Sequence, residues 1–207
     1  MLEWLIIGGG VQGTFTSHYL TAAAGVPRER LRVLDPEPEP LARWYHCCAN
    51  TGMRFMRSPD VHHLDLNPMD LREYCFATMK EPCAALMEPY SRPSLALFRE
   101  HTAQVIARHR LHELRLAGRA SGVGFDSGHV TVETDQGRIA TKRIVLAIGA
   151  SDHPHWPEWA RDLRAAGARI DHVFSRTFEL HGLPDWEHAA VIGGGITSAP
   201  LRREPMR

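Results

Sequence analysis

The sequence has few cysteines, no net charge and no long apolar run. Four cysteines in 207 residues are too few for a disulfide scaffold, which predicts a cytoplasmic chain with reduced thiols. Lys plus Arg and Asp plus Glu number 24 each, so the basic surplus typical of nucleic-acid or anionic-membrane binding is missing. No apolar run approaches the roughly 18 residues of a membrane span, and the N-terminus lacks the basic leader of a signal peptide.

What remains is the composition of an ordinary folded protein. Hydrophobic residues make up 43% and charged residues 23% of the chain, which excludes a disordered polymer. At about 150 residues per domain, the length predicts one domain or slightly more.

The first 35 residues predict a strand, a turn, a helix and a second strand. The apolar residues 5–7 run into Gly8-Gly9-Gly10 and indicate a buried strand. Residues 11–25 follow with Phe15 and Tyr19 at helical spacing, and residues 31–35 form the next apolar run. A right-handed crossover between the two strands implies a parallel sheet.

The glycines of this turn have the spacing of a dinucleotide-binding loop, Gly8-x-Gly10-x-x-Gly13. The first makes the turn tight, the second lets a pyrophosphate reach the backbone, and the third lets helix and strand pack closely. Val11 and Gln12 open the helix, whose N–H groups and dipole favour phosphate. The alternative is a glycine turn that only packs a helix on a strand.

Asp35 ends the next strand, 22 residues after Gly13. An acid about 20 residues after the turn can accept hydrogen bonds from a ribose diol. A carboxylate there disfavours a 2′-phosphate, so the pattern favours FAD or NAD over NADP.

The remaining chain predicts a mixture of helices and short strands. Residues 94–110 have the apolar spacing of a helix after Pro93, and residues 64–79 and 157–166 suggest shorter helices. Three short strands with glycine turns predict a small antiparallel meander at residues 122–125, 130–134 and 138–140. Further buried strands are expected at residues 143–149 and 189–192.

This order of elements resembles the flavoproteins with two dinucleotide-binding domains. In that family FAD binds the N-terminal turn, and a later strand that ends here at Gly149 passes near the flavin. Gly193-x-Gly195-x-x-Ser198 is similar to the family's second turn, which binds NAD(P)H. The resemblance implies FAD as cofactor, and NAD(P)H in a complete homologue.

Within these flavoproteins the sequence is most similar to flavin-containing and N-hydroxylating monooxygenases. Trp44 and the Gly-Met loop at residues 51–59 resemble the segment that those enzymes lay against the flavin ring, which implies that Met53 and Arg54 lie near the isoalloxazine. The implied function is an FAD-dependent oxidoreductase in which NADPH reduces the flavin, O₂ reacts, and one oxygen atom passes to a small-molecule substrate. The loop could equally be an ordinary surface or core-covering loop. No acid or base stands out by spacing, so catalytic residues stay unknown.

The cysteines and histidines predict neither a redox pair nor a metal site. Two cysteines are adjacent and the other two are eight residues apart, which suits neither a flavin-linked disulfide nor zinc, so buried inert thiols are expected. The neighbouring histidines lack carboxylates at ligand spacing and are expected in exposed loops. These residues are Cys47, Cys48, Cys75, Cys83, His62, His63, His153, His155 and His172.

The sequence therefore predicts an α/β, Rossmann-like FAD/NAD(P)-binding fold with a small antiparallel β-meander and an incomplete second dinucleotide-binding element. The expected divisions are an FAD-binding domain at 1–150, a connector at 151–188 and the second element at 189–207. Pro200 would interrupt a helix after the second turn, which suggests the N-terminal half of a longer flavoprotein. A catalytically inactive dinucleotide-binding fragment, or another FAD/NAD(P)-dependent reductase, remains open as an alternative.

Overall fold

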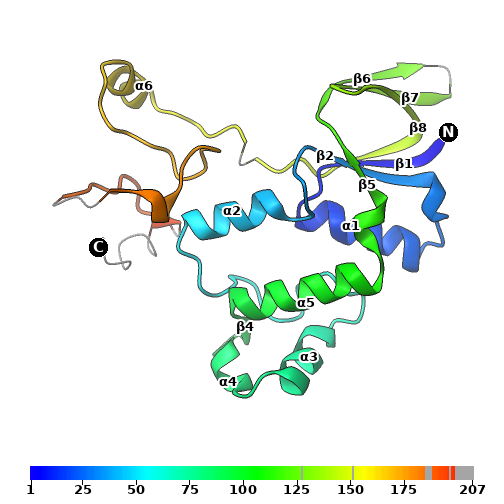
Figure 1. The fold of residues 1–207 in the computed structure, drawn as a ribbon, viewed down its shortest axis with the longest axis horizontal. Helices are drawn as coiled ribbons and strands as arrows, with labels where there is room; N and C mark the ends of the chain where they lie inside the picture. The colour runs from blue at the N-terminus through cyan, green and yellow to red at the C-terminus, as the bar shows by residue number, and fades with distance from the viewer. Residues whose placement is uncertain (127, 151, 185–187, 196, 199–207) are drawn as a thin grey trace. The chain divides into compact units, whose positions relative to one another are not determined.

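The computed structural model describes residues 1–126, 128–150, 152–184, 188–195 and 197–198. The chain forms two compact units (Figure 1). The first unit contains Met1–Arg43 and Arg54–Ile148, and the second contains Trp44–Met53 and Gly149–Arg207.

A six-stranded sheet forms the centre of the first unit, in the order β5-β2-β1-β8-β7-β6. Its first four strands are mutually parallel, and the last two pair antiparallel as the predicted meander. The strands are β1 (Leu2–Ile7), β2 (Leu31–Asp35), β5 (Arg115–Ala117), β6 (Ala120–Asp126), β7 (His129–Thr134) and β8 (Gly137–Leu146). A separate two-stranded sheet pairs β3 (Leu86–Met87) with β4 (Arg92–Pro93). The predicted α/β fold and the meander are confirmed.

One continuous strand, β8, replaces two strands that the sequence analysis expected at residues 138–140 and 143–149. Its first half pairs antiparallel with β7 and its second half pairs parallel with β1. Thr141 belongs to both ladders, opposite Val130 on one side and Leu2 on the other, and it is fully buried. The segment stays extended across residues 141–142 because each half has a hydrogen-bonding partner and the two ladders overlap at Thr141.

The core of the first unit follows the two-residue period of β1. Ile6 belongs to an apolar cluster with Leu20 of α1 and Leu111 of a short 3₁₀ helix. Its neighbours Leu5 and Ile7 belong to a second cluster, with Val130 and Val132 of the meander. Successive side chains of a strand point to opposite faces, so β1 is buried on both sides, as its uninterrupted apolar run predicts.

The helices of the first unit confirm the three segments expected there, at residues 11–25, 64–79 and 94–110. They are α1 (Val11–Ala22), α3 (Asp70–Thr78), α4 (Pro82–Ala85) and α5 (Leu95–Arg108), with short 3₁₀ helices η1 (Arg28–Arg30) and η2 (Leu111–Leu114). The side chain of Ser94 caps α5 by accepting a hydrogen bond from the Leu97 N–H at 3.2 Å. Phe15 and Tyr19 do not mark the buried face of α1: Tyr19 is 50% exposed, and the buried face carries small and polar residues such as Gly13 and Ser17.

The second unit contains most of α2 (Ala42–Asn50), together with α6 (Glu158–Ala165) and η3 (Leu180–Gly182). α6 confirms the helix expected at residues 157–166, whereas the sequence analysis did not predict α2. Buried Asn50 holds the unit together, because its side chain donates to the Phe178 carbonyl at 2.5 Å and accepts from the Leu180 N–H at 3.0 Å.

The strand expected at residues 189–192 is wrong, because these residues form no strand. A strand needs a neighbouring strand to satisfy its backbone groups. The described part of the second unit contains no strand that could pair with this segment.

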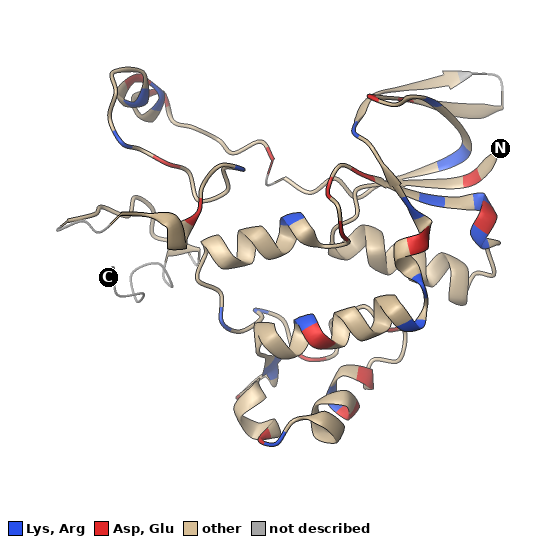
Figure 2. Cartoon of the chain, in the orientation of Figure 1, with Lys and Arg blue, Asp and Glu red and all other residues tan. Residues whose placement is uncertain are grey.

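Acidic and basic side chains are interspersed over the helices and strands, in keeping with the balanced charge (Figure 2). α5, for example, carries Arg99 and Glu100 side by side. In the part of the chain that the structure describes, no helix has both the length and the apolar character to cross a bilayer.

A buried polar cluster joins α5 to α3. His101 of α5 is fully buried, and its Nε2 lies 2.6 Å from an Asp70 carboxylate oxygen. Arg108 donates to the same oxygen at 2.9 Å, and the His63 ring meets the His101 ring edge-on at 4.9 Å. Burial lowers the pKa of His101 and of His63, although the neighbouring carboxylates oppose the shift. Both imidazoles are therefore neutral in the fold at pH 7, and buried His63 corrects the expectation of an exposed loop residue.

This cluster predicts that acid destabilises the first unit. An imidazole whose pKa is lowered in the fold takes up its proton first in the unfolded chain, below the ordinary value of 6.5, so stability falls as pH falls through that value. The free energy of urea unfolding should decrease between about pH 7.5 and about pH 5.5. His101→Gln should show a smaller decrease, whereas the exposed His112→Gln should follow the parent chain. An equal decrease in all three proteins would contradict the assignment to His101.

Candidate functional site

The predicted glycine turn lies between β1 and α1, at the carboxyl end of the parallel strands. Gly8 has a φ of 109°, and a Cβ placed there would lie 2.3 Å from the carbonyl oxygen of Ala147, the residue after β8. A Cβ on Gly13 would lie 1.8 Å from the Gly8 carbonyl oxygen. Both positions therefore exclude any side chain, and they hold the turn and the helix close together.

Gly10 differs from these two glycines because the space around it is open. It is the N-cap of α1 with φ −70° and ψ −168°, and no described atom lies within 4 Å of a Cβ placed there. Among the described residues no side chain caps this helix, and its first turn, which includes Val11 and Gln12, contains no acid. The first N–H groups of a helix lack intrahelical acceptors and form its positive pole. The turn thus offers an anion both room and donors.

Asp35 faces this turn from the end of β2. One carboxylate oxygen accepts the Gly9 N–H at 2.5 Å, and the other accepts the Glu37 N–H at 2.8 Å. The carboxylate is therefore fixed in direction beside the glycines, and each oxygen retains a lone pair for a further donor.

The carbonyl of Gly9 is fixed as firmly as its N–H. It accepts a hydrogen bond from the Leu41 N–H at 2.9 Å and another from the Thr14 hydroxyl at 3.1 Å. Leu41 is buried and has a φ of 62°, a conformation that a branched side chain adopts only under constraint. The sequence analysis missed both residues, and only the position of Thr14 at the start of the helix could have indicated its role.

A shallow pocket lies beside Asp35 within the first unit. Its lining includes Gly9, Asp35, Glu39 and Arg115. Arg115 donates to the Asp35 backbone carbonyl at 3.0 Å, while its buried Nε has no hydrogen-bond partner among the described residues. The lining of this small pocket thus includes both a carboxylate and a guanidinium.

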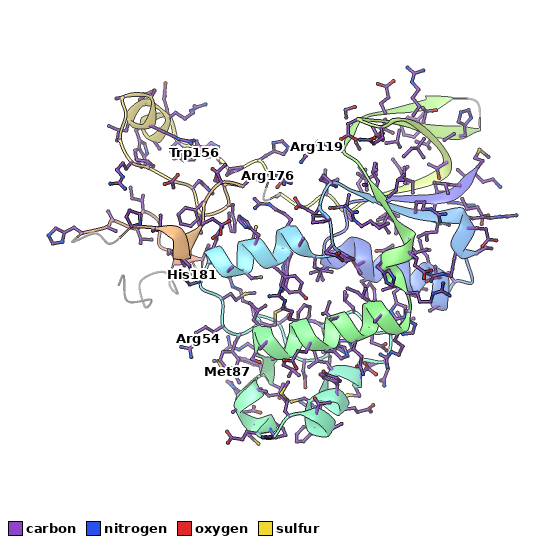
Figure 3. The ribbon with its side chains drawn as sticks, in the orientation of Figure 1. Arg54, Met87, Arg119, Trp156, Arg176 and His181 are labelled. Carbon is purple, nitrogen blue, oxygen red and sulfur yellow. The ribbon has the colours of Figure 1, made fainter. Side chains whose placement is uncertain are left out.

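The residues expected near a flavin ring are divided between the two units. Arg54 lies in the first unit beside the start of α5, where its carbonyl oxygen accepts the Leu95 N–H at 2.9 Å (Figure 3). Trp44 lies in the second unit on α2 and meets the Tyr45 ring edge-on. Met53, also in the second unit, donates its N–H to the Cys48 carbonyl. Trp44 is therefore helical, whereas residues 51–59 form the expected loop.

The glycines expected at the later turns belong to the second unit. Gly149 has a φ of 63°, and Gly193 has a φ of 124°. Ser198 folds back on Gly195, whose carbonyl accepts both its N–H and its hydroxyl. Ile196 and the segment 199–207, including Pro200, lie outside the described residues.

The cysteines are free thiols in different surroundings. Cys48 and Cys75 are buried, and burial raises the pKa of Cys75, which makes it a poor nucleophile. Cys83 is exposed, so the expectation of four buried thiols is wrong at this position.

The fold and the glycine turn together define a dinucleotide-binding protein. A sequence profile of the FAD-NAD(P)-binding family matches residues 5–151, which is more than half of the chain. The chain therefore belongs to the FAD-NAD(P)-binding family. No curated protein matches it in sequence.

Solved structures show the same fold in flavin monooxygenases. Cyclohexanone monooxygenase from Rhodococcus sp. Phi1, bound to NADP+, superimposes with a TM-score of 0.55 at 16% identity, over 76% of this chain and 27% of that one. A mutant of a flavin monooxygenase from Stenotrophomonas maltophilia gives 0.51 at 17% identity, over 76% and 41%. An oxidized steroid monooxygenase bound to NADP gives 0.52 at 16% identity, over 71% and 26%. The chain thus spans between about a quarter and two-fifths of these proteins.

Proposed function

We propose that this chain provides the FAD site of an NAD(P)H-dependent oxidoreductase of the monooxygenase type. The observation that supports this best is the open, uncapped N-terminus of α1 at Gly10, which Asp35 faces from the adjacent strand. A pyrophosphate fits the first feature and a ribose diol fits the second. The likeness to monooxygenases supports the fold, and the choice of reaction type rests on the sequence resemblance.

The chain's own groups have binding roles in this proposal. The N–H groups of Val11, Gln12 and Gly13 receive the pyrophosphate, and Asp35 accepts from the ribose. The backbone of Gly9 is fixed, because both its N–H and its carbonyl are hydrogen-bonded. We assign Trp44, Met53, Arg54 and Gly149 to the flavin end, and Gly193, Gly195 and Ser198 to NAD(P). FAD, when bound, supplies the redox chemistry between NAD(P)H, O₂ and a small-molecule substrate.

A spectrum of the purified full chain tests this proposal. We expect a flavin absorbance that stays with the protein through gel filtration, or that appears after incubation with FAD. Anaerobic addition of NADPH or NADH should then bleach it. A chain that neither retains nor takes up FAD would overturn the proposal.

A second candidate is an FAD-binding module that does not react with NAD(P)H. The observation that favours it is residues 189–192, which form no strand to support the second glycine turn. This candidate predicts bound flavin that is not bleached by either nucleotide, so the same experiment separates the two functions.

Substitution of Asp35 should weaken FAD binding without unfolding the chain. Asp35→Asn keeps an oxygen for the Gly9 N–H, loses the acceptor of the Glu37 N–H, and removes the charge that strengthens a ribose hydrogen bond. We expect a loss of about 1–3 kcal/mol, or roughly 5- to 150-fold in Kd, by fluorescence titration. The matched control is Asp135→Asn, since Asp135 also accepts a backbone N–H, from Arg119 at 2.8 Å, in another part of the unit. Equal FAD affinity in the two variants would contradict the assignment.

A further inference from the structure

Three metal-ligating side chains from distant parts of the sequence meet in the first unit. His18 comes from α1, Asp65 from the segment before α3, and His109 from the end of α5. One potential ligand atom from each lies within 4.8 Å of the other two. We propose that His18, Asp65 and His109 bind a divalent transition-metal ion of the zinc class, at a site separate from the glycine turn.

The His18 ring is held in a fixed orientation. Its side chain is almost completely buried, and its Nδ1 lies 2.9 Å from the Leu64 carbonyl oxygen. A carbonyl only accepts, so Nδ1 is the donor in this bond, which leaves Nε2 as the nitrogen that could bind a metal ion. A hydrogen bond from the second ring nitrogen to a carbonyl is the usual support of a metal-bound histidine.

His109 brings a second imidazole to the same place. Its ring centroid lies 4.0 Å from that of His18, and its Nε2 lies 3.6 Å from an Asp65 carboxylate oxygen. Its side chain is 32% exposed, which leaves the ring free to turn and gives an ion a path from solvent.

Asp65 supplies the negative charge. Its Oδ1 accepts the Asn67 N–H at 2.8 Å, which fixes the carboxylate, and its Oδ2 faces His109. Arg108 also contacts Oδ2, at 2.7 Å, and would compete with a cation. The same Arg108 nitrogen lies 2.9 Å from Asp70, so the guanidinium keeps an anionic partner when a metal takes Asp65.

The geometry suits zinc after a small adjustment. Zinc bonds of 2.0–2.2 Å in a tetrahedron place ligand atoms roughly 3.3 Å apart. The His109–Asp65 separation of 3.6 Å is close to this value, and a turn of the His109 ring can shorten the wider separations. Two imidazoles and one carboxylate select zinc, cobalt or nickel over calcium and magnesium, and they leave a fourth position for water.

The expectation of no metal site rested on histidines that are neighbours in sequence. His18 and Asp65 are 47 residues apart, and Asp65 and His109 are 44 residues apart, so no spacing motif could have indicated them. A bound ion would connect α1, which follows the glycine turn, to α5 and to the segment before α3, and would stabilise the folded first unit.

Zinc competition against a chromophoric chelator tests the site in the full chain. After metal removal with EDTA, we expect one tight zinc ion per chain, and cobalt should give the visible spectrum of a tetrahedral site. His109→Gln and Asp65→Asn should each weaken binding by more than ~10-fold. The matched controls are His62→Gln and His112→Gln, which alter exposed histidines near the site in sequence and should bind as the parent does.

The two ligand variants keep the test decisive, because both positions are partly exposed and circular dichroism reports whether each protein is folded. Equal zinc affinity in the parent, the ligand variants and the controls would overturn the proposal. So would the absence of stoichiometric binding to the parent chain. Neither result depends on FAD, so the metal site can fail while the proposed function stands.

Discussion

Gly10→Val should abolish flavin retention while the chain stays folded. No described atom lies within 4 Å of a Cβ at this position, and its backbone angles suit any residue. The valine side chain would instead fill the space where the pyrophosphate approaches the helix N-terminus. We expect FAD affinity to fall on the order of 100-fold or more, and unfolding free energy to fall by about 1 kcal/mol or less.

The control for this prediction is a valine at a glycine elsewhere in the same unit. Gly124 lies in β6, and a Cβ there would only touch the Thr131 carbonyl oxygen at 3.9 Å. Gly124→Val should therefore leave both FAD binding and stability near the parent values. If Gly10→Val retained FAD as well as Gly124→Val does, the pyrophosphate site would have to lie elsewhere.

Gly13→Ala should reduce the stability of the fold, in contrast to Gly10→Val, which should reduce FAD binding. A Cβ on Gly13 would lie 1.8 Å from the Gly8 carbonyl oxygen, an atom of the backbone that no rotamer change can move. Helix α1 would have to shift away from β1, at an expected cost of about 3 kcal/mol or more. Urea unfolding measured by circular dichroism should show the loss, along with a reduced soluble yield.

The comparison for this variant is Gly124→Ala, which should change the unfolding free energy by less than ~1 kcal/mol. An unchanged urea midpoint in Gly13→Ala would mean that the turn does not need the close packing seen in the structure. Together the two glycines separate binding from folding within one motif. Gly10→Val leaves a folded chain without FAD, whereas Gly13→Ala leaves too little folded chain to bind it.

Much of the first unit could be predicted because its elements rest on local patterns. The apolar run of β1, the glycine turn after it and the glycine turns of the meander each lie within a few residues, and all three are confirmed. The division of residues 137–146 into two strands was wrong because strand continuity depends on neighbours. β1 and β7 hold β8 extended through Thr141, and the sequence around Thr141 contains no sign of either partner.

In the candidate site, too, residues within a local motif could be predicted and residues placed by the rest of the fold could not. Gly8, Gly10, Gly13 and Asp35 follow from a motif with a known mechanical reason for each residue. Leu41, which holds the Gly9 carbonyl, could not be predicted, since its role depends on a left-handed conformation that leucine seldom adopts.

At residues 189–192 the local pattern predicted a strand that the structure does not form. The apolar run followed by glycines repeats the local pattern of β1, yet it forms no strand. Local pattern identifies a segment that is able to form a strand, but the fold must supply its hydrogen-bonding partner.

The shared strand β8 has a consequence for how this unit comes apart. The meander and the parallel sheet share one strand of ten residues, whose two halves meet at Thr141. Neither part is therefore expected to detach while the other stays folded. Loss of β7 removes the hydrogen bonds that keep the first half of β8 extended. The second half of β8 is hydrogen-bonded to β1, the strand that leads into the glycine turn. The glycine turn and the β6–β7 hairpin are therefore expected to unfold together. A substitution that destabilises the hairpin should also destabilise the glycine turn, because β8 connects the two.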